Sequence, residues 1–191
     1  AYTGEIDFRP LGVKAQAFFD IPPTAWRLDE ALLVDAFAPR SRISHKGNLG
    51  HVLVMGGAPG FGGAALLAAQ AAARLGAGKV TLATAEEHIT ASLVRCPEVM
   101  ARAVRGGAEA AGLPDTADVV VIGPGLGQDA WGQALLQSAL QGATPLVVDA
   151  DALNLLASRW PDVRRDDWIL TPHPGEAARL LGCTVAEVQA D

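Results

Sequence analysis

The sequence predicts an α/β domain in three layers, with a mainly parallel sheet flanked by helices. From His51 onward, short apolar runs alternate with longer helical stretches, a pattern typical of α/β proteins. The run 52–55 is apolar at every position, as expected for a strand that is buried on both faces. Glycine or aspartate follows several of these runs, just before a helical stretch. In such sheets the ligand site lies beyond the carboxyl ends of the strands.

The expected strands and helices follow one another in a regular order. We expect strands within 51–57, 79–84, 99–104, 118–122, 145–148 and 168–170. We expect helices over 64–75, 86–95, 131–140, 151–157 and 174–181. Gly76 suits the residue after a helix, and Pro174 with Glu176 suits the first turn of one. Four Gly-rich or polar segments then fall at strand ends, namely 56–63, 123–127, 149–154 and 171–176.

Residues 1–44 differ from the rest of the chain. They contain four prolines and little periodicity. The exceptions are a short extended stretch near 6–8 and an amphipathic helical pattern over 28–37. We interpret residues 1–38 as a linker or as the edge of a neighbouring domain.

The composition argues against several classes of protein. The chain has 191 residues, 50% of them hydrophobic, which argues against disorder. Its net charge of −6 gives no reason to expect nucleic acid binding, which needs a basic face. Two cysteines without a Cys-x-x-Cys pair argue against a disulfide framework or zinc knuckle and favour a reducing compartment. With no signal peptide or membrane-length apolar run recognised, we expect a cytoplasmic domain without membrane contact.

The Gly-rich segment 56–63 follows a strand and opens a helix, so its N–H groups could hold an anion. It is not a P-loop, because no Gly-Lys-Ser/Thr follows. It also departs from the dinucleotide fingerprint, because Thr84 and Ala85 stand where a ribose-binding acid is expected. A tight turn without a ligand remains the alternative for this segment.

A second Gly-rich segment follows the buried strand at 118–122. Gly123, Gly125 and Gly127 stand within five residues of one another. A purely structural turn needs one or two glycines, so we interpret this segment as one where a ligand touches the main chain.

Polar side chains follow two further strands. Asp149 closes a strand, and such a carboxylate can hold a metal–phosphate unit or join a polar network. Asp151 is open to two interpretations, a site residue or the N-cap of the next helix. His173 lies between two prolines at a helix start, which fixes its backbone and favours ligand contact. We interpret the remaining histidines and all tryptophans as structural: His45, His51, His88, Trp26, Trp131, Trp160 and Trp168.

Five segments in order resemble one known family. They are 45–50 (HKGNLG), 52–63, 123–127 (GPGLG), 149–154 (DADALN) and 171–176 (TPHPGE). This set resembles the ADP/ATP-dependent NAD(P)H-hydrate dehydratase family, whose fold is ribokinase-like. The resemblance covers residues 43–191 and implies the first part of that domain, incomplete at its C-terminus. Residues 1–42 resemble, more weakly, the tail of an NAD(P)H-hydrate epimerase domain and a linker, because the two domains are often fused in bacteria.

The resemblance implies a reaction and a set of binding residues. Family members dehydrate (S)-NADHX or (S)-NADPHX, the hydrated forms of NADH and NADPH, with ADP or ATP as co-substrate and Mg²⁺. It implies that Ala64, Gly125 and His173 contact the hydrated dinucleotide, with Gly123 and Gly127 in the same loop. Asp149 and Asn154 would line the cleft by their position. The resemblance also suggests a homo-oligomer whose ligands are small molecules.

One family segment does not occur in this sequence. Members carry Gly-Gly-x-Gly-Asp, whose Asp acts as the base and whose N–H groups hold the transferred phosphate. We therefore expect the catalytic base to lie beyond Asp191, and we expect residues 1–191 alone to be inactive. The choice between ADP and ATP stays open. Two alternatives also remain, a ribokinase-like thiazole or pyrimidine kinase and a non-catalytic dinucleotide-binding module.

Overall fold

The computed structural model of the chain describes residues 39–190 and, before them, residues 9, 12, 14, 34 and 37. The chain divides into two units, residues 1–42 and 43–191. The strand expected near 6–8 lies outside the described residues. The helix expected over 28–37 also lies outside them, apart from residues 34 and 37.

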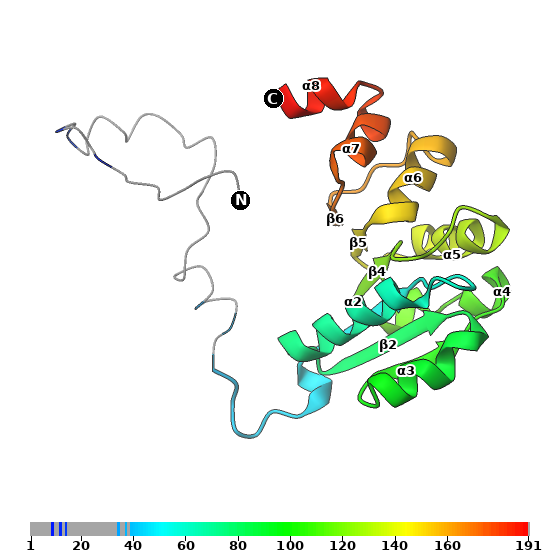
Figure 1. The fold of residues 1–191 in the computed structure, drawn as a ribbon. Helices are drawn as coiled ribbons and strands as arrows, with labels where there is room; N and C mark the ends of the chain where they lie inside the picture. The colour runs from blue at the N-terminus through cyan, green and yellow to red at the C-terminus, as the bar shows by residue number, and fades with distance from the viewer. Residues whose placement is uncertain are drawn as a thin grey trace. The chain divides into compact units, whose positions relative to one another are not determined.

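A six-stranded sheet forms the centre of the second unit, and all of its neighbouring strands are parallel (Figure 1). Its strands are β1 (His51–Met55), β2 (Lys79–Thr84), β3 (Met100–Ala103), β4 (Val119–Ile122), β5 (Leu146–Val148) and β6 (Trp168–Leu170). Their order across the sheet is β3-β2-β1-β4-β5-β6. The chain winds outward from β1 in one direction and from β4 in the other. Ligands of α/β sheets bind at such a switch point, so the order places a site above β1 and β4.

Helices connect the strands. The α-helices are α2 (Gly62–Leu75), α3 (Ile89–Arg95), α4 (Gly107–Ala110), α5 (Ala130–Gln141), α6 (Ala150–Arg159), α7 (Pro174–Leu181) and α8 (Val185–Ala190). Short 3₁₀ helices are η2 (Lys46–Asn48), η3 (Glu86–His88) and η4 (Pro114–Thr116). Within the residues that the structure describes, no helix has the length and apolarity needed to cross a membrane.

Two hydrophobic cores lie on opposite faces of the sheet. Successive side chains of a strand point to opposite faces, so neighbours on β1 enter different cores. Val54 belongs to the core formed with Ala65 and Ala69 of α2. Leu53 belongs to the other core, which includes Leu135 of α5 together with leucines of α6. The sheet is therefore the middle of three layers, and the predicted α/β class with a parallel sheet is confirmed.

The predicted strands and helices are confirmed over residues 51–181, with small differences. The stretch 86–95 is not one helix, because it begins as the 3₁₀ helix η3 and continues as α3. The sequence did not predict α4 and α8, which have four and six residues and are too short for helical periodicity to be visible. Gly76 caps α2 with φ +105°, and Pro174 begins α7, as expected.

Candidate functional site

Loops at the carboxyl ends of four strands form the candidate site. The loops follow β1, β4, β5 and β6 and correspond to the predicted segments 56–63, 123–127, 149–154 and 171–176. The first two loops are joined by backbone hydrogen bonds. Gly57 N–H donates to Pro124 O (3.1 Å), and Ala58 N–H donates to Gly125 O (2.7 Å). The structure thus brings the two Gly-rich segments together at the switch point of the sheet.

Two glycines of the second loop pack directly against neighbouring backbone. A Cβ on Gly125 (φ +58°) would collide with the carbonyl oxygen of Phe61. A Cβ on Gly123 (φ +123°) would collide with the carbonyl oxygen of Asp149. Both residues also have left-handed φ values that favour glycine. The glycines therefore allow three loops to approach one another, and their contact with a ligand stays a prediction.

Asp151 ties α6 to the same loop. Its carboxylate accepts hydrogen bonds from Gly127 N–H (3.0 Å) and from Gln128 Nε2 (3.1 Å). Asp149 occupies the N-cap position of α6, and Asp151 lies in the first turn. The N-cap interpretation of Asp151 is therefore wrong. Its carboxylate binds the loop after β4 instead of the first turn of α6.

Asp149 joins the ends of β5 and β6. Its Oδ1 accepts a hydrogen bond from Thr171 Oγ1 (2.8 Å), and its side chain makes no capping bond to α6. The next residue, Ala150, has φ +48°, a left-handed conformation that is strained for a residue with a Cβ. Strain of this kind costs about 1–3 kcal/mol and persists where surrounding contacts hold it, often beside ligands. Of the two predicted roles, these contacts fit the polar network.

His173 is the N-cap of α7. Its Nδ1 accepts a hydrogen bond from Gly175 N–H (3.0 Å), while Glu176 Oε2 accepts one from His173 N–H (3.0 Å). Its Nε2 lies 3.2 Å from Oε1 of the buried Glu176 carboxylate. Because Nδ1 acts as an acceptor, the neutral ring carries its proton on Nε2. The capping box therefore fixes the orientation of the ring, while 63% of the side chain remains exposed.

Asn154 and Ala64 occupy different helices of the site. Asn154 Oδ1 accepts a hydrogen bond from Arg179 Nη1 (2.8 Å), which connects α6 to α7. Ala64 is exposed in the first turn of α2, and the N-cap residue Phe61 provides no side-chain hydrogen bond to that turn. The N–H groups of a first helical turn lack helical acceptors and carry partial positive charge. The start of α2 can therefore hold an anionic group.

The last residue of β2 and the segment after it hold the first Gly-rich turn from the other side. Thr84 Oγ1 donates to Gly57 O (2.9 Å), and His88 Nε2 lies 3.0 Å from Ala58 O. Glu87 Oε1 accepts a hydrogen bond from Gly60 N–H (2.6 Å). Sequence reasoning named no role for Glu87 and treated His88 as structural, which its contact with the backbone of the turn fits. Their spacing carries no signal, because their contact with the turn depends on the pairing of β1 with β2.

Two other histidines have the structural roles that the sequence predicts. His51 is buried, and its ring nitrogens lie 2.7 Å from Thr116 O and 2.8 Å from Thr81 Oγ1. His45 caps η2, because its Nδ1 accepts a hydrogen bond from Gly47 N–H (3.2 Å).

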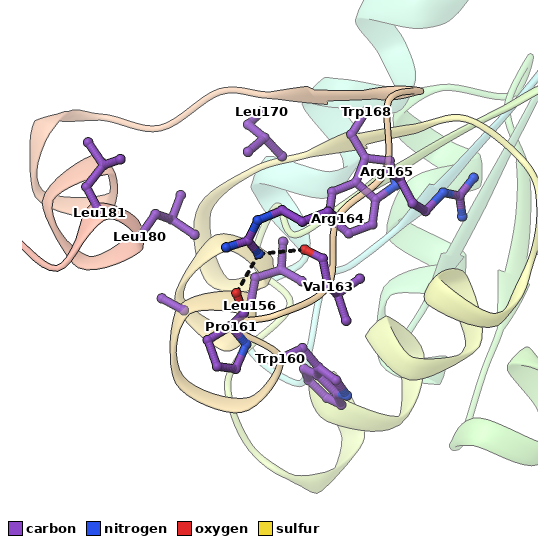
Figure 2. A pocket seen from close by; sticks show the side chains of 11 residues that line it. Leu156, Trp160, Pro161, Val163, Arg164, Arg165, Trp168, Leu170, Leu180 and Leu181 are labelled. Carbon is purple, nitrogen blue, oxygen red and sulfur yellow. Dashed lines mark hydrogen bonds between the residues drawn. The ribbon is translucent and has the colours of Figure 1, made fainter.

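A pocket of about 320 Å³ lies beside β6, on the side of α6 and α7. Figure 2 shows leucines of α7, Trp160 and Trp168 around the side chain of Arg164. The Arg164 guanidinium donates to the carbonyl oxygens of Pro161 (2.5 Å) and Val163 (2.8 Å). The walls of this pocket are mostly apolar, and none of its lining residues belongs to the Gly-rich loops. We therefore assign the strand-end loops, and not this pocket, to the candidate site.

The described residues contain no group of three or more His, Cys, Asp or Glu side chains that could hold a metal ion. Asp149 is the predicted carboxylate nearest to such a role, and its Oδ1 is engaged by Thr171. Mg²⁺ usually needs only one or two protein carboxylates, together with waters and substrate phosphates. Mg²⁺ in a reaction of this family would accompany the nucleotide.

Comparison with known proteins identifies the family. Residues 52–191 match the family model described as NAD(P)H-hydrate dehydratase. The chain belongs to the NAD(P)H-hydrate dehydratase family. It is 49% identical over 192 residues to a bifunctional NAD(P)H-hydrate repair enzyme of Coxiella burnetii, covering 100% of this chain and 39% of that protein. It is 38% identical to an ADP-dependent (S)-NAD(P)H-hydrate dehydratase of Streptococcus pneumoniae, covering 86% of this chain and 58% of that protein.

Solved structures of the NAD(P)H-hydrate dehydratase family share the fold. The ADP/ATP-dependent NAD(P)H-hydrate dehydratase of Bacillus subtilis, co-crystallised with ATP/Mg²⁺, is 36% identical with a TM-score of 0.69, covering 80% of this chain and 55% of that one. A ribokinase-like superfamily protein of Enterococcus faecalis is 30% identical with a TM-score of 0.75, covering 85% and 62%. The predicted ribokinase-like fold is confirmed. The chain spans about two fifths to three fifths of the length of these relatives.

Proposed function

We propose that this chain supplies the dinucleotide-binding part of an ADP-dependent (S)-NAD(P)H-hydrate dehydratase. The whole reaction converts (S)-NADHX or (S)-NADPHX to NADH or NADPH, with ADP giving AMP and phosphate. The observation that carries the proposal is the start of α2, which has no side-chain cap and follows the first Gly-rich loop. The second Gly-rich loop packs against Phe61 at this helix start and is hydrogen-bonded to the first loop. Such a helix start suits the pyrophosphate of a dinucleotide.

In this proposal the chain binds and orients the substrate. Main-chain groups at Ala64, Gly123, Gly125 and Gly127 approach the dinucleotide, and the fixed ring of His173 contacts it. Asp149 and Asn154 keep the ends of β5, α6 and α7 in place through Thr171 and Arg179.

The chemistry needs a better leaving group than hydroxide. Transfer of the β-phosphoryl group of ADP to the hydrate's hydroxyl oxygen releases AMP and the hydroxyl proton. Loss of phosphate from that ring carbon, together with a proton from the adjacent ring carbon, then forms the ring double bond of NADH or NADPH. Mg²⁺ supplies charge neutralisation to the nucleotide phosphates. No residue of this chain is assigned as the base that removes the hydroxyl proton, since the Gly-Gly-x-Gly-Asp segment of the family does not occur in it.

The first 42 residues fit a bifunctional protein. The bifunctional relative from Coxiella burnetii covers 100% of this chain, whereas the ADP-dependent dehydratase from Streptococcus pneumoniae covers 86%. We propose that residues 1–42 are the tail of an epimerase domain and a linker, and that residues 43–191 begin the dehydratase domain. We also propose a cytoplasmic protein, which fits the free thiols of Cys96 and Cys183. As the family resemblance suggests, we propose that it forms a homo-oligomer.

Calorimetric titration of the chain with (S)-NADHX tests the proposal, with Ala64→Glu as the variant and Ala64→Gln as its matched control. A carboxylate near a helix start favours the helix, so folding should be maintained. The same charge should repel the pyrophosphate and weaken binding by about tenfold or more, while the isosteric amide should weaken it less. Equal affinity of both variants, or no binding by the unmodified chain, would contradict the proposed site.

A further inference from the structure

A second hollow lies beside the first Gly-rich turn, at the ends of β2 and β3. It measures about 410 Å³ and is lined by Pro59 of the turn and by Glu86, Glu87, Arg105 and Trp131. Glu87 accepts the hydrogen bond from Gly60 N–H, so the hollow adjoins the turn that the proposed function assigns to the dinucleotide. Neither the sequence prediction nor the proposed function assigns a role to Glu86 or Arg105.

The charged groups of this hollow are of both signs and accessible. Arg105 Nη2 lies 3.1 Å from Glu86 Oε2, and Arg105 Nη1 lies 3.6 Å from Glu109 Oε1. The side chains of Arg105 and Glu86 are 71% and 66% exposed. Ion pairs with this exposure stabilise a protein by about 1 kcal/mol or less, so a ligand can open the pair at little cost.

One wall of the hollow is a fixed aromatic ring. Trp131 Nε1 donates a hydrogen bond to Val104 O (2.9 Å), which holds the indole in the place where α5 begins. The ring is partly buried against the core that contains Leu135. A flat, oriented indole is suited to stack against a planar base.

The strand order connects this hollow to the rest of the site. β2 and β3 lie on one side of β1, whereas β4, β5 and β6 lie on the other. Glu86 follows β2 and His173 follows β6, so the two residues lie on opposite sides of the loop that leads from β1 into α2. A dinucleotide with its pyrophosphate at the start of α2 would extend one nucleoside toward each of them.

We propose that Glu86 and Arg105 read the 2′ position of the adenosine ribose and thereby allow both forms of the substrate to bind. The inference rests on the proposed function. NADHX and NADPHX differ only in the 2′-phosphate. A carboxylate accepts the hydrogen bond of a free 2′-hydroxyl, and a guanidinium binds a 2′-phosphate. In the proposal, Glu86 accepts the hydrogen bond from the 2′-hydroxyl of NADHX. When NADPHX binds, Arg105 breaks its ion pair with Glu86 and binds the 2′-phosphate.

Titration of the 191-residue chain with (S)-NADHX and with (S)-NADPHX tests this inference. Arg105→Gln should lower the affinity for NADPHX by about tenfold, the effect of losing one charge-assisted phosphate contact, and leave NADHX affinity within about twofold. Glu86→Gln should lower NADHX affinity and raise NADPHX affinity, because it removes the competing partner of Arg105. Arg102→Gln, on β3 and outside the lining of the hollow, is the matched control and should change neither.

The outcomes separate this inference from the proposed function. If the unmodified chain binds both dinucleotides and Arg105→Gln weakens both equally or neither, the role of the pair is overturned and the proposed function stands. If the unmodified chain binds neither dinucleotide, both are overturned. Equal thermal unfolding midpoints for the variants and the unmodified chain would assign the selective loss to recognition and not to misfolding.

Discussion

Gly125 combines a left-handed backbone with close loop packing. Its φ is +58°, and the carbonyl oxygen of Phe61 occupies the place of a Cβ. A methyl group there must strain the backbone or push the two Gly-rich loops apart. Gly63, in the first turn of α2, has open space at the same position. The two glycines thus form a matched pair for testing how closely the two Gly-rich loops pack.

We predict that Gly125→Ala lowers the free energy of unfolding by about 2 kcal/mol or more, because strain and collision act together. Gly63→Ala should instead raise it by up to about 1 kcal/mol, because alanine restricts the unfolded chain and favours helix. Urea unfolding of the two variants measures both effects. Equal effects of the two substitutions would contradict the loop packing described here.

At the scale of elements, His173 serves both the N-terminus of α7 and, as proposed, the ligand. Asparagine is also a good N-cap, whereas alanine caps poorly. We therefore predict that His173→Ala lowers the free energy of unfolding by about 1 kcal/mol and that His173→Asn largely restores it. Both variants should bind (S)-NADHX more weakly, by calorimetry, if the ring contacts the ligand. If His173→Asn binds (S)-NADHX as tightly as the unmodified chain, His173 caps α7 and does not contact the ligand.

The segment just before β6 contains an ion pair between Arg165 and Asp167. Arg165 Nε donates to Asp167 Oδ1 (2.8 Å), and Arg165 Nη1 donates to Gly142 O (2.7 Å). The hydrogen bond from Arg165 holds the pKa of Asp167 below its ordinary value and raises the pKa of Arg165. Because the folded pKa of Asp167 is lowered, its contribution to stability is present above the unfolded pKa and is lost as pH falls through the folded pKa.

Asp167→Asn should therefore be less stable than the unmodified chain near neutral pH. The difference should shrink as pH falls below about 3.9, the ordinary pKa of aspartate, and should vanish below the lowered folded pKa. Urea unfolding at several pH values measures the difference. A difference that stays constant from neutral to acid pH would show that the Arg165–Asp167 pair does not produce it.

Local sequence patterns predict some elements of this fold and are silent about others. The apolar runs at 52–55 and 119–122 identify strands of a parallel sheet that helices cover on both faces, and both runs are buried or half-buried throughout. Parallel strands end at one edge, so the site segments can be placed from sequence as well. The roles of Asp151 and Glu87 cannot be predicted from the sequence. Their hydrogen-bond partners, Gly127 and Gly60, lie in other loops that come close only in the tertiary structure.

At the scale of the whole molecule, the chain contains a sheet whose Gly-rich loops meet at the strand ends, and its sequence lacks the Gly-Gly-x-Gly-Asp segment of the family. Its relatives extend beyond the part that it matches. We predict that the 191-residue chain, mixed with (S)-NADHX, ADP and Mg²⁺, restores no NADH absorbance above a control without protein. The physical reason is that binding alone does not remove the hydroxyl proton or hold the transferred phosphate. ADP-dependent recovery of NADH would contradict this prediction and would show that one of the 191 residues acts as the base.

The central claim is that the dinucleotide binds at the strand-end loops around the start of α2. Titration of isotope-labelled chain with (S)-NADHX, followed by backbone amide NMR shifts, tests it most directly. We predict that the amide signals of Gly57, Ala64 and Gly125 shift with a common dissociation constant. Those of Trp160 and Trp168, beside the apolar pocket at β6, should stay in place. Shifts confined to the pocket, or no shifts at the Gly-rich loops, would contradict the claim.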